Sequence, residues 1–556
     1  MSDANKPNRP SDFNVLTFTV PCPSCGATVA FASVGSIMSV CSYCQTTVVR
    51  QGDKVKAQGK QSLTIEDYSP LQIGSSGSFD NHTFVIIGRV QLEYSEGIWN
   101  EWYLHFDNGR DGWLSEALGQ YTLTLDKGEH GELPRYDDLS IKQSVSFDGH
   151  DYTVTDKRMA TAIAGEGELP FVMETGWQTW GIDARYKRRF ITLDYGEHGK
   201  DRAPIVYQGR SVTLSQLAMQ MLKDDRQLGE SGRLANSGSG DDGNDEGEKR
   251  DLDKLDCPNC GSPVPYVAGS TNCLICPACY SEIKLTGDTA EVLKLHSMLA
   301  AQQTSLSLGD KARIDEKEIA DISAIQHDAD TAAGNKHHDY VVIGIQRLEE
   351  VGEDADWTEY LLYSFTNGFL WLEEDEEGWH VARVLNELPI DKGRYLQYND
   401  KKWRKQYDDS YTSRVTYAVG AFSWQVKMND TMLLTDYGNG KQTLTSEQNA
   451  EEITYTISSP RKKSTIAKWF GKKLDSGPAS TGRPKRDATS LGKVIMANIL
   501  VIVIILIVCF TALIIIDAVF SGRNGTTRSG GYSNHSNSGV YTTGGRTGYT
   551  SSSWHK

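Results

Sequence analysis

The chain has 556 residues, enough for about three to five domains of ~100–200 residues each. Hydrophobic residues make up 38% and aromatic residues 9%, which excludes a chain that is disordered throughout. The first 460 residues hold 43 basic and 70 acidic side chains, a net charge of −27, and such a body repels phosphate backbones. The composition therefore predicts a folded protein that does not bind nucleic acid.

The cysteines suggest metal binding in a reducing compartment. The segment from Met1 to Asn14 is polar and has no apolar core of a secretion signal. Of the ten cysteines, nine fall into two tight clusters, and the tenth, Cys509, lies in a long apolar run. Clustered cysteines in a reducing cytosol bind metals more readily than they form disulfides.

Each cluster has the pattern Cys-x2-Cys, then 15 residues, then Cys-x2-Cys, and Gly26 or Gly261 follows the second cysteine. Each Cys-x-x-Cys turn delivers two sulfurs, and four thiolates suit tetrahedral Zn²⁺ in a closed, structural site. We therefore predict two structural zinc ions, with an iron–sulfur cluster as the lesser alternative. The predicted ligands are Cys22, Cys25, Cys41 and Cys44 for one ion, and Cys257, Cys260, Cys276 and Cys279 for the other.

Cys273 complicates the second cluster because it could form a rival Cys-x2-Cys pair with Cys276. The two clusters align without a gap at an offset of 235 residues, and this alignment places Met38 opposite Cys273. We therefore expect Cys273 to be a small buried side chain near the metal. A redox role for it is left open.

The duplication extends beyond the cysteines. The block from Trp99 to Leu104 resembles the block from Trp357 to Leu362, and Asp194-Tyr195-Gly196 resembles Asp436-Tyr437-Gly438. Such blocks are rich in Val, Ile, Tyr and Trp, and Asn-Gly or Asp-Gly pairs separate them, which is typical of short strands joined by hairpin turns. The predicted fold class is mainly β: two small zinc ribbons alternate with two antiparallel barrel-like or sandwich-like domains, followed by one transmembrane helix.

The C-terminal region predicts a membrane anchor. Val494 to Ile516 is a run of 23 uncharged residues that, as a helix, would span about 34 Å, enough for a ~30 Å hydrocarbon core. More Lys and Arg residues lie close before this run than after it, so the N-terminal body is expected inside and the tail outside. We therefore predict a single-pass protein of the cytoplasmic (inner) membrane, with membrane lipid as a partner.

Helical signal in the body is sparse, and the best candidates are Leu214 to Lys223 and Ala290 to Gln302. The predicted organisation is zinc ribbon 1 at 15–55, β-domain 1 at 66–225, an acidic flexible linker at 226–256, zinc ribbon 2 at 257–288, a helical connector at 289–330, β-domain 2 at 335–460, a basic linker at 461–493, the transmembrane helix at 494–516 and a flexible Gly/Ser/Tyr-rich tail at 521–556.

The second β-domain carries a distinctive series of motifs: Gly344, Trp357-x-Glu359-Tyr360-Leu361-Leu362, Trp371-Leu372, Gly420-Ala421-Phe422-Ser423-Trp424, Asp436-Tyr437, Glu447 and Glu452-Ile453-Thr454-Tyr455. This series, over about residues 335–458, resembles the bacterial domain-of-unknown-function family numbered 4178, with a weaker copy at about 80–215. In the weaker copy, Glu168-Leu169-Pro170-Phe171 stands where the second copy has Ala421 to Trp424. The resemblance implies no enzyme activity. It implies zinc ribbons, membrane segments, and a membrane-associated system that includes small membrane proteins and polyamine-synthase-like enzymes.

We find no P-loop, dinucleotide fingerprint, nucleophile elbow or zinc-protease motif, so no catalytic and no cofactor-binding residues are predicted apart from the zinc ligands. The predicted function is a membrane-anchored, non-enzymatic zinc-ribbon scaffold or adaptor that binds partner proteins. The alternative is an accessory subunit that binds a small cationic ligand, such as a polyamine, through its acidic β-domains. A third class, an enzyme whose site carries no recognised motif, is left open.

Overall fold

The structure, a computed structural model, describes residues 18–474 apart from internal gaps. The gaps are 52–53, 61–68, 95–96, 118, 174–175, 198–201, 224–252, 267–270, 272, 287–288, 296–303, 323–336 and 365–366. Every described residue belongs to one of the two units into which the chain divides, the unit of Met1–Arg483 with Ser552–Lys556.

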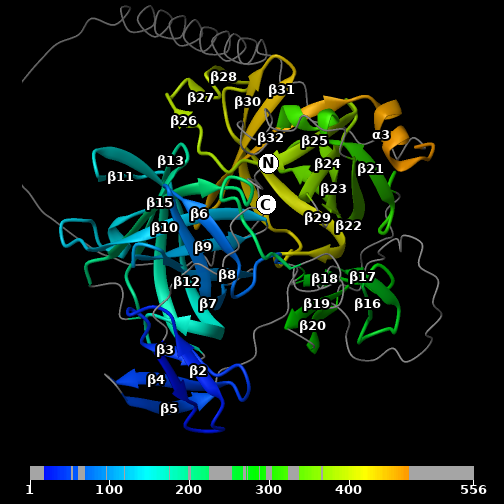
Figure 1. The fold of residues 1–556 in the computed structure, drawn as a ribbon. Helices are drawn as coiled ribbons and strands as arrows, with labels where there is room; N and C mark the ends of the chain where they lie inside the picture. The colour runs from blue at the N-terminus through cyan, green and yellow to red at the C-terminus, as the bar shows by residue number, and fades with distance from the viewer. Residues whose placement is uncertain are drawn as a thin grey trace, which may run out of the picture. The chain divides into compact units, whose positions relative to one another are not determined.

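The first β-domain is built from antiparallel strands (Figure 1). Its elements are β6 (Ser76–Phe79), β7 (His82–Glu93), β8 (Ile98–Phe106), β9 (Asp111–Ala117), β10 (Gln120–Glu129), the 3-10 turn η2 (Tyr136–Asp138), β11 (Ser144–Phe147), β12 (His150–Leu169), β13 (Gln178–Tyr186), β14 (Arg189–Asp194) and β15 (Ile205–Val212). Eight strands pair in the order β7-β8-β9-β10-β15-β14-β13-β12, and β12 pairs back onto β7. This closed ring, called barrel 1 below, confirms the prediction of a mainly β domain.

The second β-domain repeats this arrangement. Its elements are β21 (Lys311–Asp315), η4 (Glu316–Glu318), η5 (Ala320–Ile322), β22 (His337–Glu350), β23 (Asp356–Ser364), β24 (Gly368–Glu374), β25 (Trp379–Val384), β26 (Ile390–Asp391), β27 (Tyr395–Tyr398), β28 (Lys401–Lys405), β29 (Tyr411–Phe422), β30 (Thr431–Asn439), β31 (Gln442–Gln448) and β32 (Ile453–Arg461). The order β22-β23-β24-β25-β32-β31-β30-β29 closes because β29 pairs with both β22 and β30. We call this ring barrel 2. The two rings have the same strand order, so the duplication inferred from the sequence is a duplication of topology.

Tight hairpin turns in both copies are made of Asp, Asn and Gly residues, although only Asp148-Gly149 among the three below is of the predicted Asn-Gly or Asp-Gly type. Asp80-Asn81 joins β6 to β7 and Asp148-Gly149 joins β11 to β12, and all four residues have positive φ. Asn399-Asp400, between β27 and β28, does the same in the second domain. Two consecutive residues with positive φ form the type I′ turn, whose twist matches that of the flanking strands.

A pair of glycines lies where each ring closes, at the pairing of β7 with β12 in barrel 1 and of β22 with β29 in barrel 2. A Cβ on Gly88 of β7 would lie 1.7 Å from the Glu168 carbonyl oxygen, and one on Gly167 would lie 2.3 Å from that of Ile87. Gly344 and Gly420 hold the same places in barrel 2, and Gly167 and Gly420 both have positive φ. A strand register shift lies next to Gly88 and next to Gly344, so these glycines allow β-bulges that bend each barrel shut.

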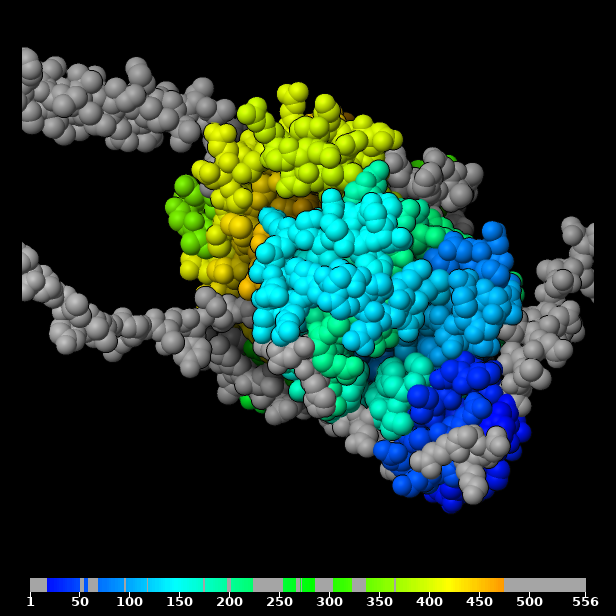
Figure 2. All heavy atoms as spheres, turned by 90° about the vertical axis from the view of Figure 1, so that its left-hand side faces the viewer, coloured from blue at the N-terminus to red at the C-terminus, as the bar shows by residue number. Residues whose placement is uncertain are grey.

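Each ribbon consists of short β-hairpins, and the second hairpin of each ribbon pairs with a strand of its barrel. Ribbon 1 consists of β1 (Phe18–Pro21), β2 (Thr28–Phe31), β3 (Met38–Val40), β4 (Thr46–Gln51) and β5 (Lys54–Lys60). Ribbon 2 consists of β16 (Asp253–Asp256), β17 (Pro263–Tyr266), β18 (Cys273–Ile275), β19 (Ser281–Thr286) and β20 (Thr289–Leu295). Strand β3 pairs with the end of β12, and β18 pairs with the end of β29. Figure 2 shows ribbon 1 (dark blue) as a lobe that adjoins barrel 1 (light blue to cyan).

Three predicted segments are corrected. The connector at 289–330 was expected to be helical, but Thr289–Leu295 is strand β20, because its residues pair along β19 and complete ribbon 2. The helix expected at Leu214 to Lys223 is a series of turns. The acidic linker was expected to reach Asp256, but its last four residues form β16, which pairs with β17.

The predicted basic linker at 461–493 begins as part of the second domain. Lys463–Phe470 forms helix α3, whose Ile466 and Trp469 are buried in the core around barrel 2. The Trp469 indole donates to Glu318 at 2.6 Å, and Lys472 pairs with Asp310. The acids that bind this segment come from the turns around β21, so part of its positive charge is paired within the second domain.

The predicted localisation is also corrected. Within the residues that the structure describes, no helix has the length and apolar character needed to cross a membrane, so a single-pass inner-membrane protein is not supported. The predicted span, Val494 to Ile516, and the predicted tail lie outside the described residues.

Candidate metal centres and barrel interiors

The structure brings the four predicted sulfurs of each cluster together. In ribbon 1, Cys22 Sγ lies 3.7 Å from Cys44 Sγ, and Cys25 Sγ lies 3.7 Å from Cys41 Sγ. All four ligand atoms lie within 4.8 Å of one another. The sequence pattern predicts this quartet, and the four sulfurs lie close enough together to hold one ion.

Ribbon 2 repeats the geometry with its own cysteines. Cys257 Sγ lies 3.6 Å from Cys279 Sγ, and Cys260 Sγ lies 3.6 Å from Cys276 Sγ. In both quartets two cysteines are buried, one is half-buried and one is exposed. Each site therefore lies at the edge of its small hairpin core, where an ion would tie the two Cys-x-x-Cys turns together.

Backbone hydrogen bonds shape each Cys-x-x-Cys turn into the same knuckle. In the first turn, the N–H of Gly26 donates to the Cys22 carbonyl at 2.8 Å, and the N–H of Cys22 donates to Ala27 at 2.7 Å. The other three turns follow the same pattern, and the residue after the second cysteine has positive φ in all four: Gly26, Gln45, Gly261 and Tyr280. Glycine at two of these places was a readable sequence signal, whereas Gln45 and Tyr280 adopt the conformation at a cost in strain.

The sulfur spacing fits zinc. Four sulfurs at the usual Zn–S distance of ~2.3 Å in a tetrahedron are about 3.8 Å apart. The measured separations of 3.6 and 3.7 Å match that edge and are far longer than a disulfide bond. Two cysteine quartets able to hold an ion are thus present, consistent with two zinc sites. Four thiolates complete a tetrahedron, so such a site offers structure and no open position for a reacting water.

Hydrogen bonding lowers the pKa of one thiol in ribbon 1, Cys44, and of two thiols in ribbon 2, Cys260 and Cys279. The hydroxyl of Thr46 lies 3.1 Å from Cys44 Sγ, and hydrogen bonds with its side chain and backbone lower the pKa of Cys44 to about 6. Burial acts against Cys279, yet hydrogen bonds with Ser281 and Asn259 lower its pKa to about 6 as well. Burial raises the pKa of Cys276 to about 12. Metal binding must therefore displace a proton from Cys276, and this makes the affinity dependent on pH.

Cys273 lies outside the quartet, as the alignment with Met38 predicts. It is buried in β18, and burial raises the pKa of its thiol to about 12. The backbone of Val426 forms a hydrogen bond with this thiol, and in the first copy the N–H of Met173 donates to Met38 Sδ at 3.2 Å. Both sulfurs therefore fill the same position between a ribbon and its barrel, where Cys273 is packed as a buried side chain.

The joint between ribbon 1 and barrel 1 is made by a buried glutamate. Glu168 accepts hydrogen bonds from the N–H of Ala32 at 2.6 Å, the N–H of Ser33 at 3.2 Å and the hydroxyl of Ser36 at 2.7 Å. Burial raises the pKa of this carboxyl. The second copy has Ala421 here, and Gln425 instead donates to Glu282 of ribbon 2 at 2.8 Å. Glu168, at which the first copy departs from the motif of the second, thus fastens ribbon 1 to its barrel.

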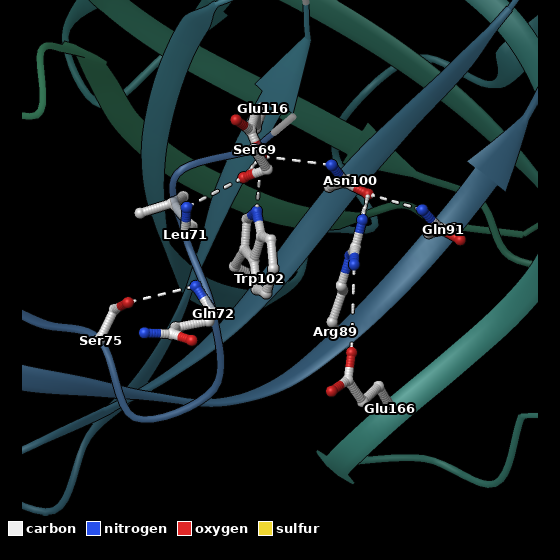
Figure 3. A network of polar contacts seen from close by, with 10 residues as sticks. All are labelled: Ser69, Leu71, Gln72, Ser75, Arg89, Gln91, Asn100, Trp102, Glu116 and Glu166. Carbon is white, nitrogen blue, oxygen red and sulfur yellow. Dashed lines mark hydrogen bonds and ion pairs between the residues drawn. The ribbon is translucent and has the colours of Figure 1, made fainter. Parts of the chain in front are cut away.

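A polar network on the outer face of barrel 1 fastens the segment that precedes β6 (Figure 3). The carboxylate of Glu116 accepts from the hydroxyl of Ser69 at 2.6 Å and from the indole of Trp102 at 2.9 Å. Asn100 donates to the same oxygen at 3.2 Å and accepts from Arg89 at 2.8 Å. Barrel 2 keeps the core of this network, since Glu374 accepts from Ser305 at 2.6 Å and from Tyr360 at 2.7 Å.

The interior of barrel 1 is lined by carboxylates that sequence analysis missed. Glu101 on β8 accepts from Ser115 at 2.7 Å and from the Trp99 indole at 2.8 Å. Burial, together with the nearby charges of Asp183 and Asp194, raises the pKa of Glu101 to about 7. Strand β8 lies across the ring from β13 and β14, so charges on these strands reach Glu101 through the interior of the barrel.

Strand register corrects one pair in the sequence alignment. Asp194, which was aligned with Asp436, ends β14, whereas Asp436 lies on β30, the counterpart of β13. The true counterpart of Asp436 is Asp183. Thr192 donates to Asp183 at 2.7 Å, and Thr445 donates to Asp436 at 2.7 Å from the paired position of the neighbouring strand. The Asp-Tyr-Gly sequence shared by the two copies therefore aligned residues that are not equivalent. The pairing of the strands identifies the equivalent residues.

Comparison with known proteins agrees with these two barrels. Residues 72–214 and 335–461 each match the family described as "Domain of unknown function (DUF4178)". These segments contain all eight strands of barrel 1 and all eight strands of barrel 2, so the family's model matches once in each copy. No curated protein matches the chain.

Proposed function

We propose that this protein is a non-enzymatic adaptor in which two zinc-loaded ribbons, each built onto a β-barrel, bind partner proteins. The observation that carries the proposal is the pair of closed cysteine quartets, each in a hairpin that continues a barrel sheet. Such a ribbon has a fixed position on a rigid body, and two of them in one chain give a partner two points of attachment.

The surface of ribbon 1 supports a role in protein contact. Val34 is 88% exposed, Tyr43 is 81% exposed and Ile37 is 44% exposed. Large side chains at this exposure keep apolar surface in water, and a partner would cover that surface. Tyr43 lies between two predicted zinc ligands, Cys41 and Cys44, so the ion would hold it in place.

The test combines metal analysis with site-specific photo-crosslinking of the full-length chain. Wild type should contain about two zinc ions per chain. A photo-reactive residue at Val34 should crosslink one discrete partner in cells, and the same residue at Val351, which is 41% exposed on barrel 2, should not. Tyr43→Ala, which copies Ala278 of ribbon 2, should weaken that crosslink while zinc content stays unchanged. Equal crosslinking from both positions would reject the adaptor role even if both ions are present.

A further inference from the structure

Ribbon 1 displays large apolar side chains that ribbon 2 does not have. The two ribbons align at the offset of 235 residues through their last strands, since the bounds of β4 and β5 match those of β19 and β20 at this offset. The exposed side chains of ribbon 1 are Val34, Ile37 and Tyr43. The residues at the same places of ribbon 2 are Gly269, Asn272 and Ala278. The ribbon fold therefore does not require apolar side chains at these places.

Barrel 1 holds Val34 in a fixed loop. Ser33 and Ser36, on either side of it, are both buried. The Ser33 hydroxyl donates to Asp111 at 2.9 Å, and the Ser36 hydroxyl donates to Glu168 at 2.7 Å. Two acids of barrel 1 thus fasten the loop on both sides of a valine that remains in water. A loop that is ordered before binding loses less conformational entropy when a partner covers it, so this arrangement favours docking.

Ribbon 1 is also the basic part of an acidic chain. Residues 18–60 hold four basic side chains and one acid, a net charge of +3, whereas residues 253–295 hold three basic side chains and five acids, a net charge of −2. The basic residues of ribbon 1 are Arg50, Lys54, Lys56 and Lys60. The residues at the same places of ribbon 2 are Leu285, Thr289, Glu291 and Leu295. A positive lobe on a chain whose first 460 residues carry −27 attracts negatively charged groups to that lobe.

The basic and apolar residues of ribbon 1 lie beside each other. The N–H of Arg50 donates to the Ile37 carbonyl at 2.8 Å, at one end of β3. Tyr43 lies at the other end of β3, just before the start of β4, whose first residue pairs with Lys60. Strand β5, which carries three of the four basic residues, is the last strand of its sheet (Figure 1), and its Lys56 is exposed. A complementary surface would therefore carry acidic and apolar side chains together.

We propose that ribbon 1 docks an acidic segment of a partner protein, one that carries apolar side chains to cover Val34, Ile37 and Tyr43. This inference rests on the proposed adaptor role and specifies the chemistry of the partner. A membrane or a nucleic-acid duplex presents negative charge over a wide area, and the acidic remainder of the chain would be repelled from it. A protein segment needs to contact ribbon 1 alone.

The test uses the full-length chain in cells, with a photo-reactive residue at Val34. Mass spectrometry of the crosslinked product identifies the segment of the partner that lies against ribbon 1. That segment should carry a net negative charge and apolar side chains. Lys56→Glu, which copies Glu291 of ribbon 2, should lower the crosslink yield by about fivefold, because it brings a negative charge to the acidic segment.

Two controls separate the effect of charge from an effect on folding. Lys254→Glu makes the same change at an exposed residue of ribbon 2 and should leave the yield unchanged. Lys56→Arg keeps the positive charge and should also leave the yield unchanged. All three variants should retain about two zinc ions per chain, so that a lower yield reports a lost contact at an intact ribbon.

The outcomes distinguish this inference from the adaptor role. The absence of any protein crosslink from Val34 would reject both. A protein crosslink to a neutral or basic segment, or an equal yield in Lys56→Glu and wild type, would overturn the inference and leave the adaptor role standing. Crosslinking of Val34 to phospholipid, to nucleic acid or to a second copy of this chain would also overturn it.

Discussion

The two ribbon–barrel modules share a framework and differ in what is attached to it. Both keep the cysteine quartet and the pair of glycines where the ring closes. Both also keep a serine-to-glutamate hydrogen bond on the outer face, Ser69 to Glu116 and Ser305 to Glu374, which we call the Glu–Ser latch. They differ at the ribbon joint, where the first module has Glu168 and the second has Ala421 at the equivalent position. They also differ in the interior, where the first has Arg185 and the second has Gly438. The glycines at the closing strand pair are therefore the same in both modules, while the joint and the interior charge differ.

This comparison separates structural from specialised residues without an alignment of relatives. A feature needed for folding should produce the same defect in either module. A specialised feature should produce a defect in one module alone.

Loss of one zinc ligand should have the largest effect. Cys41→Ser should release one of the two zinc ions and unfold ribbon 1, because structural zinc contributes about 10–16 kcal/mol to folding of such small units. Cys276→Ser should do the same to ribbon 2. Elemental analysis and hydrogen exchange of the full-length chain measure both outcomes.

Cys273→Ser is the matched control, since this cysteine lies outside the quartet. It should retain two zinc ions per chain. If it lost one, Cys273 would be a ligand and the alignment of the two clusters would be wrong.

Gly88→Ala should cost about 3–5 kcal/mol of barrel 1 stability, because the new Cβ would lie 1.7 Å from a backbone oxygen that cannot move away. Gly344→Ala should cost less, about 1–3 kcal/mol, since its nearest contacts are an aromatic ring at 2.8 Å and a backbone oxygen at 2.9 Å. Urea unfolding of the full-length chain measures both. Gly131→Ala, where a Cβ would meet nothing within 4 Å, should change stability by less than ~1 kcal/mol. Equal costs at Gly88 and Gly131 would show that the crossing is not tight.

The stability of barrel 1 should fall as pH rises from about 4.5 to about 7. The pKa of Glu101 is about 7 in the folded state against a model value of 4.5, so the folded chain binds more protons than the unfolded chain in this window. The loss amounts to at most about 3 kcal/mol and is complete above the folded pKa. Glu101→Gln should remove this part of the pH dependence.

The measurement is the urea midpoint of wild type and Glu101→Gln between pH 4.5 and 8. The variant should gain on wild type as pH rises, because glutamine carries no charge that burial would penalise. Asp183 and Asp194, whose pKa values burial also raises, contribute slopes of the same sign in both proteins. A difference between the two proteins that does not change with pH would contradict the assignment of Glu101 to a buried, charged interior.

The sequence predicted the two cysteine quartets residue by residue and the barrels only as mainly β domains. The spacing of the cysteines and the Met38–Cys273 alignment predicted both quartets, since ligand spacing is a local property of the chain. Strand type was also readable. Closure of each ring was not, because pairing of β7 with β12 depends on contacts between residues distant in the sequence.

The misassigned elements have physical causes as well. Thr289–Leu295 contains good helix formers, but pairing with β19 outweighs that propensity. Glu101 escaped notice because it was read only as part of the block from Trp99 to Leu104, which predicts a short strand. Its retention as Glu359 was the available signal. Distinguishing an inward from an outward face required knowledge of the ring.

The smallest effect should come from the Glu–Ser latch, and it should be unequal between the modules. Ser69→Ala removes one of several donors to Glu116, which still accepts from Trp102 and Asn100, so we expect a cost of about 1 kcal/mol. Ser305→Ala leaves Glu374 with the hydroxyl of Tyr360 as its described partner, and should cost about 2 kcal/mol. Urea unfolding of each full-length variant, with the exposed Ser215→Ala as a control expected to change stability by less than ~0.5 kcal/mol, measures the difference. A larger cost at Ser69 than at Ser305 would mean that the extra donors of barrel 1 do not share the load on Glu116, and the network of Figure 3 would then depend on its serine alone.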